Sequence, residues 1–292
     1  MTGTSNRGRW GPDDELGALN LIGEREVVRA AGLVRTGRVV RLGQDLGPRA
    51  LVPPHRKRFE RYMTRDGGDY AAGARRPGGF QFAEDVVSFA SHTGTHVDAL
   101  AHAWYDDELY NGFPSSSIRS TTGAQHCGAD KLRPMVTRGL LLDVSERDGT
   151  PLQAGDAVSR SDLERAARAA GVTPEPGDAV LLHTGWLARA AHDVADYFAG
   201  EPGLDLDAAQ WLADADVAVV GADNYAVEVQ PTAPDVMFPV HQLLVRDHGV
   251  PLIENVVLGE LWQAGAKQFL FVAAPLPLVG GTAGPVCPVA VL

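Results

Sequence analysis

The chain has 292 residues, a formal net charge of −11 at pH 7 and an isoelectric point near 5.2. An acidic protein of this kind repels phosphate groups, so no nucleic-acid partner is expected. Hydrophobic residues make up 45% of the sequence and charged residues 22%, proportions that are typical of a globular protein with a real core.

Three further features argue for a reducing compartment and against a membrane. Cys127 and Cys287 are too few for a disulfide framework, so a cytoplasmic location is expected. The N-terminal stretch MTGTSNRGRWGPDDELG lacks the apolar segment of a signal peptide. The most apolar run, FLFVAAPLPLVGG, is interrupted by Pro275 and Pro277 and is too short to span a bilayer. No membrane partner is therefore expected.

Helix-like and strand-like segments alternate along the chain, which favours an α/β architecture in a single domain over residues 1–292. Amphipathic patterns predict helices over residues 24–37, 159–171, 186–200, 207–215 and 239–249. Apolar runs of strand length cover residues 139–144, 178–186 and 216–224. In the helix from residue 159, we expect Ser161 to cap the first turn, with Glu164 completing a capping box.

Residues 47–82 depart from this alternation. They are rich in glycine, proline and arginine, and they are basic within an acidic chain. A long irregular loop of this kind is usually functional or mobile. Two interpretations stay open, namely an arm that packs against another subunit and a lid whose arginines meet an anionic substrate.

The segment SHTGTHVDALAHAWYDD concentrates titratable side chains, which are His92, His96, Asp98 and His102. In one unbroken strand His92 and His96 would stand about 13 Å apart. Ligands that bind one ion at about 2.0–2.2 Å cannot be so far apart. We therefore predict that a strand ending near His92 enters a tight turn with Gly94 as its pivot.

Two imidazoles and a carboxylate suit Zn²⁺, Mn²⁺ or Fe²⁺ and leave positions open for water. Water on such an ion ionises near neutral pH and becomes a nucleophile. His102 is placed to carry protons beside that site. Ordinary structural histidines are the less favoured alternative. The sequence contains no G-x-S-x-G, P-loop, H-E-x-x-H or G-x-G-x-x-G motif that would indicate another chemistry.

The stretch HTGTHVDALAH resembles the H-x-G-T-H-x-D-x-x-x-H signature of the metal-dependent cyclase family, which includes bacterial kynurenine formamidase and isatin hydrolase. Other blocks are similar to its longer members in the same order, including RWGPDDELGALNLI, LLHTGW, VVGADN, FPVHQLL, PLIENVVL and PLPLVGGTAGPVCPVA. The resemblance implies a swivelling β/β/α fold with a mixed, barrel-like sheet and outer helices. It also implies a homodimer or homotetramer.

The resemblance further implies a role for individual residues. His102 matches the catalytic proton carrier of the family. The matches to metal ligands are His92, His96, Asp98, which can bridge two ions, His241, and Glu254 as a second bridging ligand. His248 is a rival to His241, because the stretch between His241 and Glu254 is one residue longer than in the formamidases. Such ligands suit one or two ions of Zn²⁺ or Mn²⁺.

Family members hydrolyse amide bonds in small, often aromatic compounds, so aromatic residues near the signature are candidates for a substrate pocket. Trp104 directly follows the signature. Trp186 ends a predicted strand, where α/β sites tend to lie. His183 is a candidate hydrogen-bonding partner of the substrate. Ordinary core packing is the alternative for all three residues.

The leading hypothesis is a metal-dependent hydrolase that opens an amide or lactam C–N bond, other than a peptide bond, in a small cyclic or aromatic substrate. One alternative is a metal-dependent cyclase or dehydratase that acts on a small-molecule carbonyl. Another is a metal-binding or ligand-binding protein without turnover. The sequence leaves the substrate, the choice between Zn²⁺ and Mn²⁺, and the number of subunits open.

Overall fold

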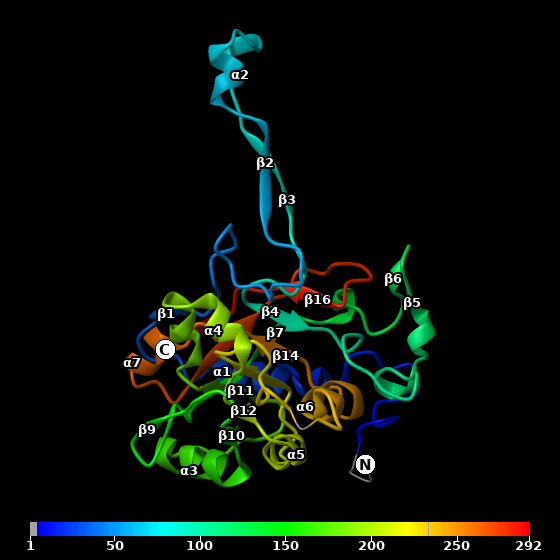
Figure 1. The fold of residues 1–292 in the computed structure, drawn as a ribbon, viewed down its shortest axis with the longest axis vertical. Helices are drawn as coiled ribbons and strands as arrows, with labels where there is room; N and C mark the ends of the chain where they lie inside the picture. Colours follow the sequence, from blue (N-terminus) through cyan, green and yellow to red (C-terminus); the bar gives the residue numbers. More distant parts are fainter. Residues whose placement is uncertain (1–4, 233) are drawn as a thin grey trace.

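A mixed nine-stranded sheet forms the centre of the protein in a computed structural model that describes residues 5–232 and 234–292 (Figure 1). In spatial order its strands are β1 (Val39–Arg41), β17 (Val289–Val291), β15 (Gln268–Ala273), β7 (Met135–Asp143), β11 (Ala179–His183), β13 (Val219–Ala222), β14 (Leu252–Glu254), β4 (His96–Asp98) and β16 (Ala283–Pro285). The four strands β7, β11, β13 and β14 run parallel, and the neighbours on either side pair antiparallel. The sheet curls into a half-barrel, which confirms the predicted α/β fold.

The central strands are buried on both faces. In β11, Val180 and Leu182 pack into one hydrophobic core, and Leu181 packs into a second core on the opposite side. Successive residues of a strand point to opposite faces, so one continuous apolar run supplies both cores. This is why the strand-length apolar runs of the sequence show no polar alternation.

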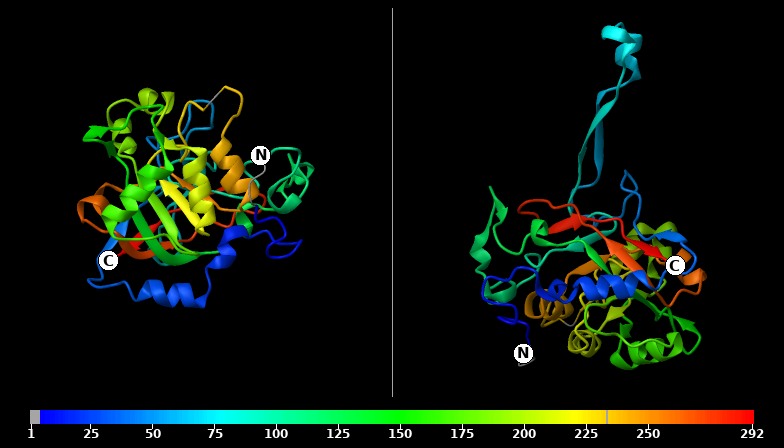
Figure 2. Two further views of the ribbon diagram at one scale, coloured as in Figure 1. Left: turned by 90° about the horizontal axis from the view of Figure 1, so that it is seen from below. Right: turned by 180° about the vertical axis from the view of Figure 1, so that it is seen from behind.

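Helices cover both faces of the sheet (Figure 2). Residues of α3 (Arg160–Ala170), α5 (Leu206–Asp214) and the π-helix η7 (Gln242–Asp247) belong to the first core. Leu261 of α7 (Gly259–Gln263) belongs to the second, and α1 (Glu24–Ala31) lies against β7 and β15. None of the helices in the described part of the chain is both long and apolar enough to cross a bilayer.

Short elements make the remaining connections. The helical ones are η1 (Gly17–Leu21), η3 (Tyr110–Gly112), η4 (Ser115–Ser117), η5 (Ala129–Lys131), η6 (Trp186–Ala191), α4 (Val194–Ala199) and α6 (Pro239–His241). The paired short strands are β5 (Ile118–Arg119) with β6 (Gly123–Ala124), β8 (Glu146–Arg147) with β9 (Thr150–Pro151), and β10 (Ala157–Val158) with β12 (Gly203–Leu204).

The ends of several predicted helices differ from the structure. The capping box of α3 uses Ser159 and Asp162, two residues earlier than the predicted pair, because the Asp162 carboxylate also accepts the backbone N–H of Ser159. The helix predicted over residues 186–200 is divided into η6 and α4. The break occurs where the Asp193 side chain accepts the N–H groups of Ala195 and Asp196 and starts a new helix.

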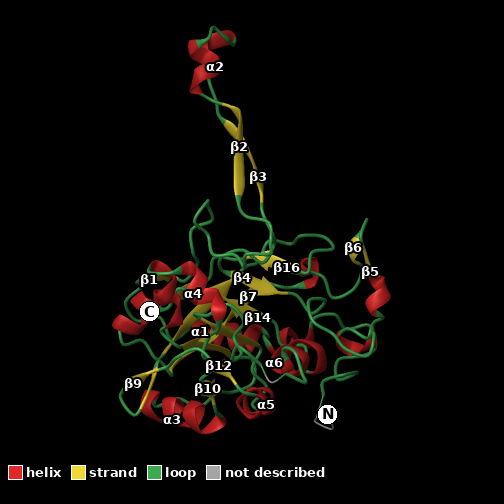
Figure 3. Cartoon of the chain, in the orientation of Figure 1, coloured by secondary structure: helices red, strands yellow, loops and turns green. Residues whose placement is uncertain are grey.

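The predicted loop over residues 47–82 contains regular structure. β2 (Glu60–Arg65) pairs antiparallel with β3 (Glu84–Ser88), and α2 (Gly67–Ala71) and η2 (Pro77–Gly79) lie between them. The hairpin projects far from the body, with α2 at its tip (Figure 3). The strand expected to end near His92 is therefore β3 of this projection and lies outside the central sheet.

Candidate metal centre

A sharp turn brings the signature histidines together, as predicted. Gly94 has a φ of 59°, a conformation that glycine adopts without steric cost. The hydroxyl of Thr93 donates to the carbonyl of Ala90 at 2.6 Å, and that of Thr95 donates to the carbonyl of Asn255 at 2.7 Å. These bonds fix both sides of the turn, and β4 begins directly after it at His96.

Two neighbouring strands carry three of the predicted ligands. His96 of β4 stands opposite Glu254 of β14 in the sheet, and Asp98 lies two residues further along β4 on the same face. The Nε2 atom of His96 lies 3.2 Å from Oε2 of Glu254 and 3.6 Å from Oδ1 of Asp98. Residues that are 158 positions apart in the sequence are therefore brought together by strand pairing alone.

His92 and His241 complete the cluster from outside the sheet. The Nε2 atom of His92, before the turn, lies 3.4 Å from Oδ1 of Asp98. The Nε2 atom of His241, at the end of α6, lies 3.6 Å from Oδ2 of Asp98 and 3.5 Å from Oε1 of Glu254. All five residues that the sequence predicts as ligands thus face one another.

The spacing of these atoms fits a bound metal ion. Two ligand atoms at about 2.1 Å from a tetrahedral ion are about 3.4 Å apart, whereas hydrogen-bonded atoms are closer. The contacts of Asp98 with the three imidazoles, at 3.4 to 3.6 Å, match the first value. Both Asp98 oxygens and Nε2 of His96 are also buried without a hydrogen-bond partner. Buried polar atoms without partners are costly, and a cation would satisfy all three.

The charges of the cluster favour a cation as well. Asp98 and Glu228 are fully buried, and Glu254 is 5% exposed. Burial raises the pKa of the Asp98 carboxyl, but the imidazoles of His102, His241 and His92 outweigh that effect and hold the pKa well below its usual range. Burial opposes protonation of His241, yet the nearby carboxylates of Asp98, Glu228 and Glu254 raise its pKa far above the usual value. Positive charge is therefore strongly favoured among these carboxylates.

Asp98 is shared between two groups of possible ligands. One group is His96, Asp98 and Glu254, and the other is His92, Asp98 and His102. Nδ1 of His102 lies 3.0 Å from Nε2 of His92, so the two imidazoles are hydrogen-bonded. Burial lowers the pKa of His92 to about 3 and also lowers that of His102, so both are neutral at pH 7. This arrangement accommodates one ion or two.

Glu228 supports the cluster and was not found from the sequence. Its carboxylate accepts the backbone N–H groups of Val240 and His241 and lies 2.5 Å from Nδ1 of His241. A carboxylate behind a ligating imidazole fixes the orientation of the ring. The only sequence signal was a lone acidic residue in the apolar stretch YAVEV, which pattern analysis cannot connect to a histidine 13 residues later.

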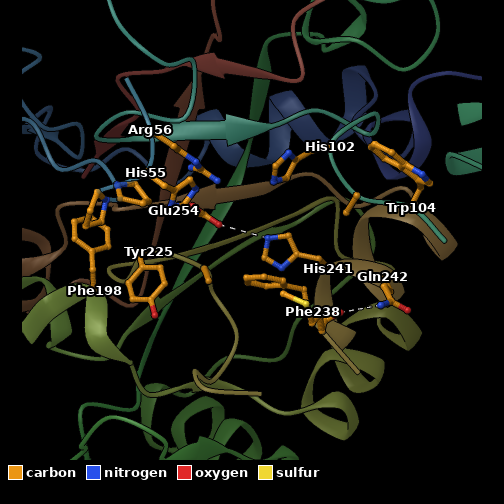
Figure 4. A pocket seen from close by; sticks show the side chains of 15 residues that line it. His55, Arg56, His102, Trp104, Phe198, Tyr225, Phe238, His241, Gln242 and Glu254 are labelled. Carbon is orange, nitrogen blue, oxygen red and sulfur yellow. Dashed lines mark hydrogen bonds and ion pairs between the residues drawn. The ribbon is translucent and has the colours of Figure 1, made fainter. Parts of the chain in front are cut away.

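A cavity of about 500 Å³ opens onto the cluster (Figure 4). His102, His241 and Glu254 line it together with Trp104, so the structure brings the predicted Trp104 to the candidate site. The other lining residues are Pro53, Pro54, His55, Arg56, Ala103, Phe198, Tyr225, Ala226, Met237, Phe238 and Gln242. No pattern in the sequence indicates that the loop before β2 forms a wall of the cavity, so sequence analysis alone treats His55 as a surface residue.

Two predicted substrate-binding residues do not line this cavity. His183 ends β11, two strands and therefore about 10 Å from β14. Its Nδ1 lies 3.1 Å from Asp143, and its ring stacks on Trp262. Trp186 is buried, and its indole N–H donates to the carbonyl of Tyr197 at 3.2 Å. Both side chains therefore have packing partners away from the cavity.

His248, the rival ligand, is also buried, and neither it nor His241 belongs to the two closest ligand groups among the described residues. His241 is distinguished by its Nε2 atom, which lies 3.6 Å from Asp98 and 3.5 Å from Glu254. It follows the π-helix η7, whereas His241 precedes it. Its carbonyl accepts the side-chain amide of Asn6, which ties this residue to the N-terminal segment. The geometry therefore favours His241.

A matched pair of substitutions tests this choice. We expect His241→Ala to weaken metal binding by at least tenfold, because it removes an imidazole 3.5 to 3.6 Å from Asp98 and Glu254. His248→Ala should leave metal affinity near that of the wild type. Isothermal titration with Zn²⁺ and Mn²⁺ measures both. The reverse order of effects would assign the ligand to His248.

Comparison with known proteins identifies the family of this chain. Residues 34–229 match the family described as "Putative cyclase". A crystal structure of a novel cyclase is 33% identical, with a TM-score of 0.91 over 99% of this chain and all of that one. Isatin hydrolase from Roseibium aggregatum is 27% identical over 277 residues, which cover 93% of each chain. Isatin hydrolase A from Ralstonia solanacearum shares the fold, with 24% identity and a TM-score of 0.66 over 90% of this chain and 95% of that one. The chain belongs to the cyclase family.

Proposed function

We propose that this protein is a metal-dependent hydrolase that opens the C–N bond of a small cyclic amide. This proposal rests mainly on a set of histidine and carboxylate atoms that are spaced as ligands of one ion. They lie at the wall of a cavity that is large enough for a small organic molecule. The similarity to isatin hydrolase along almost the whole chain supports a cyclic amide as the substrate class.

His92, His96, Asp98, His241 and Glu254 would hold the metal, and Zn²⁺ and Mn²⁺ both suit this mixture of imidazole and carboxylate ligands. When bound, the ion supplies an activated water nucleophile and polarises the amide carbonyl. Glu228 holds Nδ1 of His241, so that Nε2 of this imidazole is directed toward Asp98 and Glu254.

His102 is the proposed proton carrier. It lines the cavity, and burial lowers its pKa, so at neutral pH the imidazole is free to accept a proton. It would take a proton from the attacking water and deliver it to the nitrogen that leaves the carbonyl carbon. The hydrogen bond to His92 fixes the ring for this transfer.

The cavity walls fit a flat substrate that becomes an anion. The side chains of Trp104, Phe198, Tyr225 and Phe238 provide aromatic surface for a planar ring. Arg56 lies in the same wall, and its Nη1 is 3.4 Å from the carbonyl oxygen of His92. Hydrolysis of a cyclic amide creates a carboxylate, which this guanidinium would stabilise.

We also propose a cytoplasmic location. The buried Cys127 and the exposed Cys287 are both free thiols, the state that a reducing compartment maintains.

The proposed activity is tested with the metal-loaded protein and a panel of cyclic amides, including isatin and simple five- and six-membered lactams. We expect ring opening of at least one aromatic cyclic amide, seen as loss of substrate absorbance and as a product heavier by one water. If the loaded protein opens no member of the panel but closes an open-chain amide acid into a ring, a cyclase is the correct assignment.

The role of His102 is tested by His102→Ala, with the exposed His192→Ala as the matched control. We expect His102→Ala to lower kcat by at least ~100-fold, the usual contribution of a general acid–base group, with metal content unchanged. The control should keep wild-type kcat. Full activity of His102→Ala would contradict the assignment, and a parallel loss of metal would make His102 a ligand.

A further inference from the structure

A residue in the left-handed conformation follows the proposed ligand Glu254 at the end of β14. Asn255 has a φ of 56° and is 3% exposed, so the chain turns sharply here inside the protein. Asparagine tolerates this conformation better than most residues, but glycine adopts it at no steric cost. A side chain at this position therefore indicates a role that glycine could not fill.

The side chain of Asn255 is held by a buried tyrosine. Its Oδ1 atom accepts the hydroxyl of Tyr197 at 2.7 Å, and Tyr197 is fully buried in α4. The tyrosine ring packs against Phe198 and Tyr225, with centroid distances of 4.9 and 5.8 Å, and both of these residues line the cavity (Figure 4). The hydrogen bond thus joins the turn after a proposed ligand to a packed aromatic cluster.

The backbone of Asn255 fastens the same turn to its neighbours. Glu254 pairs with His96 in the ladder between β14 and β4. In the same register Asn255 stands opposite Thr95, whose hydroxyl donates to the Asn255 carbonyl at 2.7 Å. On the other side, the N–H of Asn255 donates to the carbonyl of Asn224 at 2.8 Å. The end of β14 is therefore tied both to the turn that gathers the histidines and to the segment that follows β13.

These bonds fix the direction of the Glu254 carboxylate. Its Oε2 atom lies 3.2 Å from Nε2 of His96, and its Oε1 atom lies 3.5 Å from Nε2 of His241. If the turn after Glu254 loosened, the end of β14 would shift and carry the carboxylate away from these atoms. Residues that hold a metal ligand in place typically change metal affinity by roughly 10-fold to 100-fold when they are replaced.

We propose that Tyr197 and Asn255 are positioning residues of the metal centre, and that the hydrogen bond between them fixes the turn that directs Glu254 toward the other ligands. This inference rests on the metal centre of the proposed function, but it does not depend on the substrate. Glu228 has the corresponding role behind His241. Both ligands that lie outside the signature are then held by a buried polar group.

A matched pair of tyrosine substitutions tests the proposal in the full-length protein. Tyr110 is also fully buried, and its hydroxyl donates to the carboxylate of Asp14 in the N-terminal segment at 2.9 Å. Tyr197→Phe should weaken the binding of Zn²⁺ and Mn²⁺ at least tenfold in isothermal titration, whereas Tyr110→Phe should bind as the wild type does. Each variant loses one buried hydrogen bond, so thermal unfolding should show a similar loss of stability in both.

The outcomes separate this inference from the proposed function. A wild type that binds metal together with a Tyr197→Phe variant of equal affinity would overturn this inference alone, and so would an equal loss of affinity in the Tyr110→Phe control. A wild type that binds no metal would overturn the proposed function and this inference with it.

The other partner of the bond gives a second variant. Asn255→Gly removes the acceptor but keeps the turn, because glycine adopts the same backbone conformation. It should also weaken metal binding at least tenfold, and Tyr197→Phe/Asn255→Gly should bind no more weakly than Asn255→Gly alone, because both changes remove the same bond. Losses that multiply in the double variant would show that the two side chains act independently and would contradict the proposed pair.

Discussion

The candidate site depends on one buried carboxylate. Asp98 is fully buried in β4, and its two oxygens are approached by three imidazoles at 3.4 to 3.6 Å without a hydrogen bond. An isolated charge in this position would destabilise the fold by several kcal/mol. A divalent cation between these atoms removes that cost. The ion that the proposed chemistry needs would therefore also stabilise the fold.

The rest of the structure serves to place groups around Asp98. The sheet sets Glu254 beside His96, the turn at Gly94 returns His92, and Glu228 orients His241. Because β14 pairs with β13 on its other side, the parallel strands with their two cores form a rigid base for the site. The loop before β2 lies outside this base, forms one wall of the cavity and continues directly into the projecting hairpin.

Part of this organisation could be predicted from the sequence. The eleven-residue signature and its glycine required a turn that gathers His92, His96 and Asp98, because no regular element could do so. The alternation of apolar segments gave the α/β class. His241 and Glu254 came from the family resemblance alone, since strand pairing over 158 residues leaves no local pattern.

Other features lay beyond the sequence for physical reasons. Glu228 is recognisable only once α6 is folded against it, and Arg56 reaches the cavity from a loop that has no periodicity. Phe198 reaches it from the short helix α4. Trp186 follows a buried strand as an active-site residue could, but its indole packs beneath Tyr197. Residues 47–82 were predicted to be irregular because glycine, proline and arginine hide β2, which pairs with the predicted strand β3 across an 18-residue connection.

The most direct test of the account is the metal content of the purified protein, measured by mass spectrometry for the wild type, for Asp98→Asn and for Asp143→Asn. Asp143 ends β7, four strands from β4, and its Oδ1 is hydrogen-bonded to Nδ1 of His183, away from the proposed ligands, so it provides a matched control. We predict one or two ions of Zn²⁺ or Mn²⁺ per chain in the wild type and in Asp143→Asn, and none in Asp98→Asn. A wild-type protein that binds no divalent ion even after reconstitution, or an Asp98→Asn variant that binds as many as the wild type, would contradict the central claim.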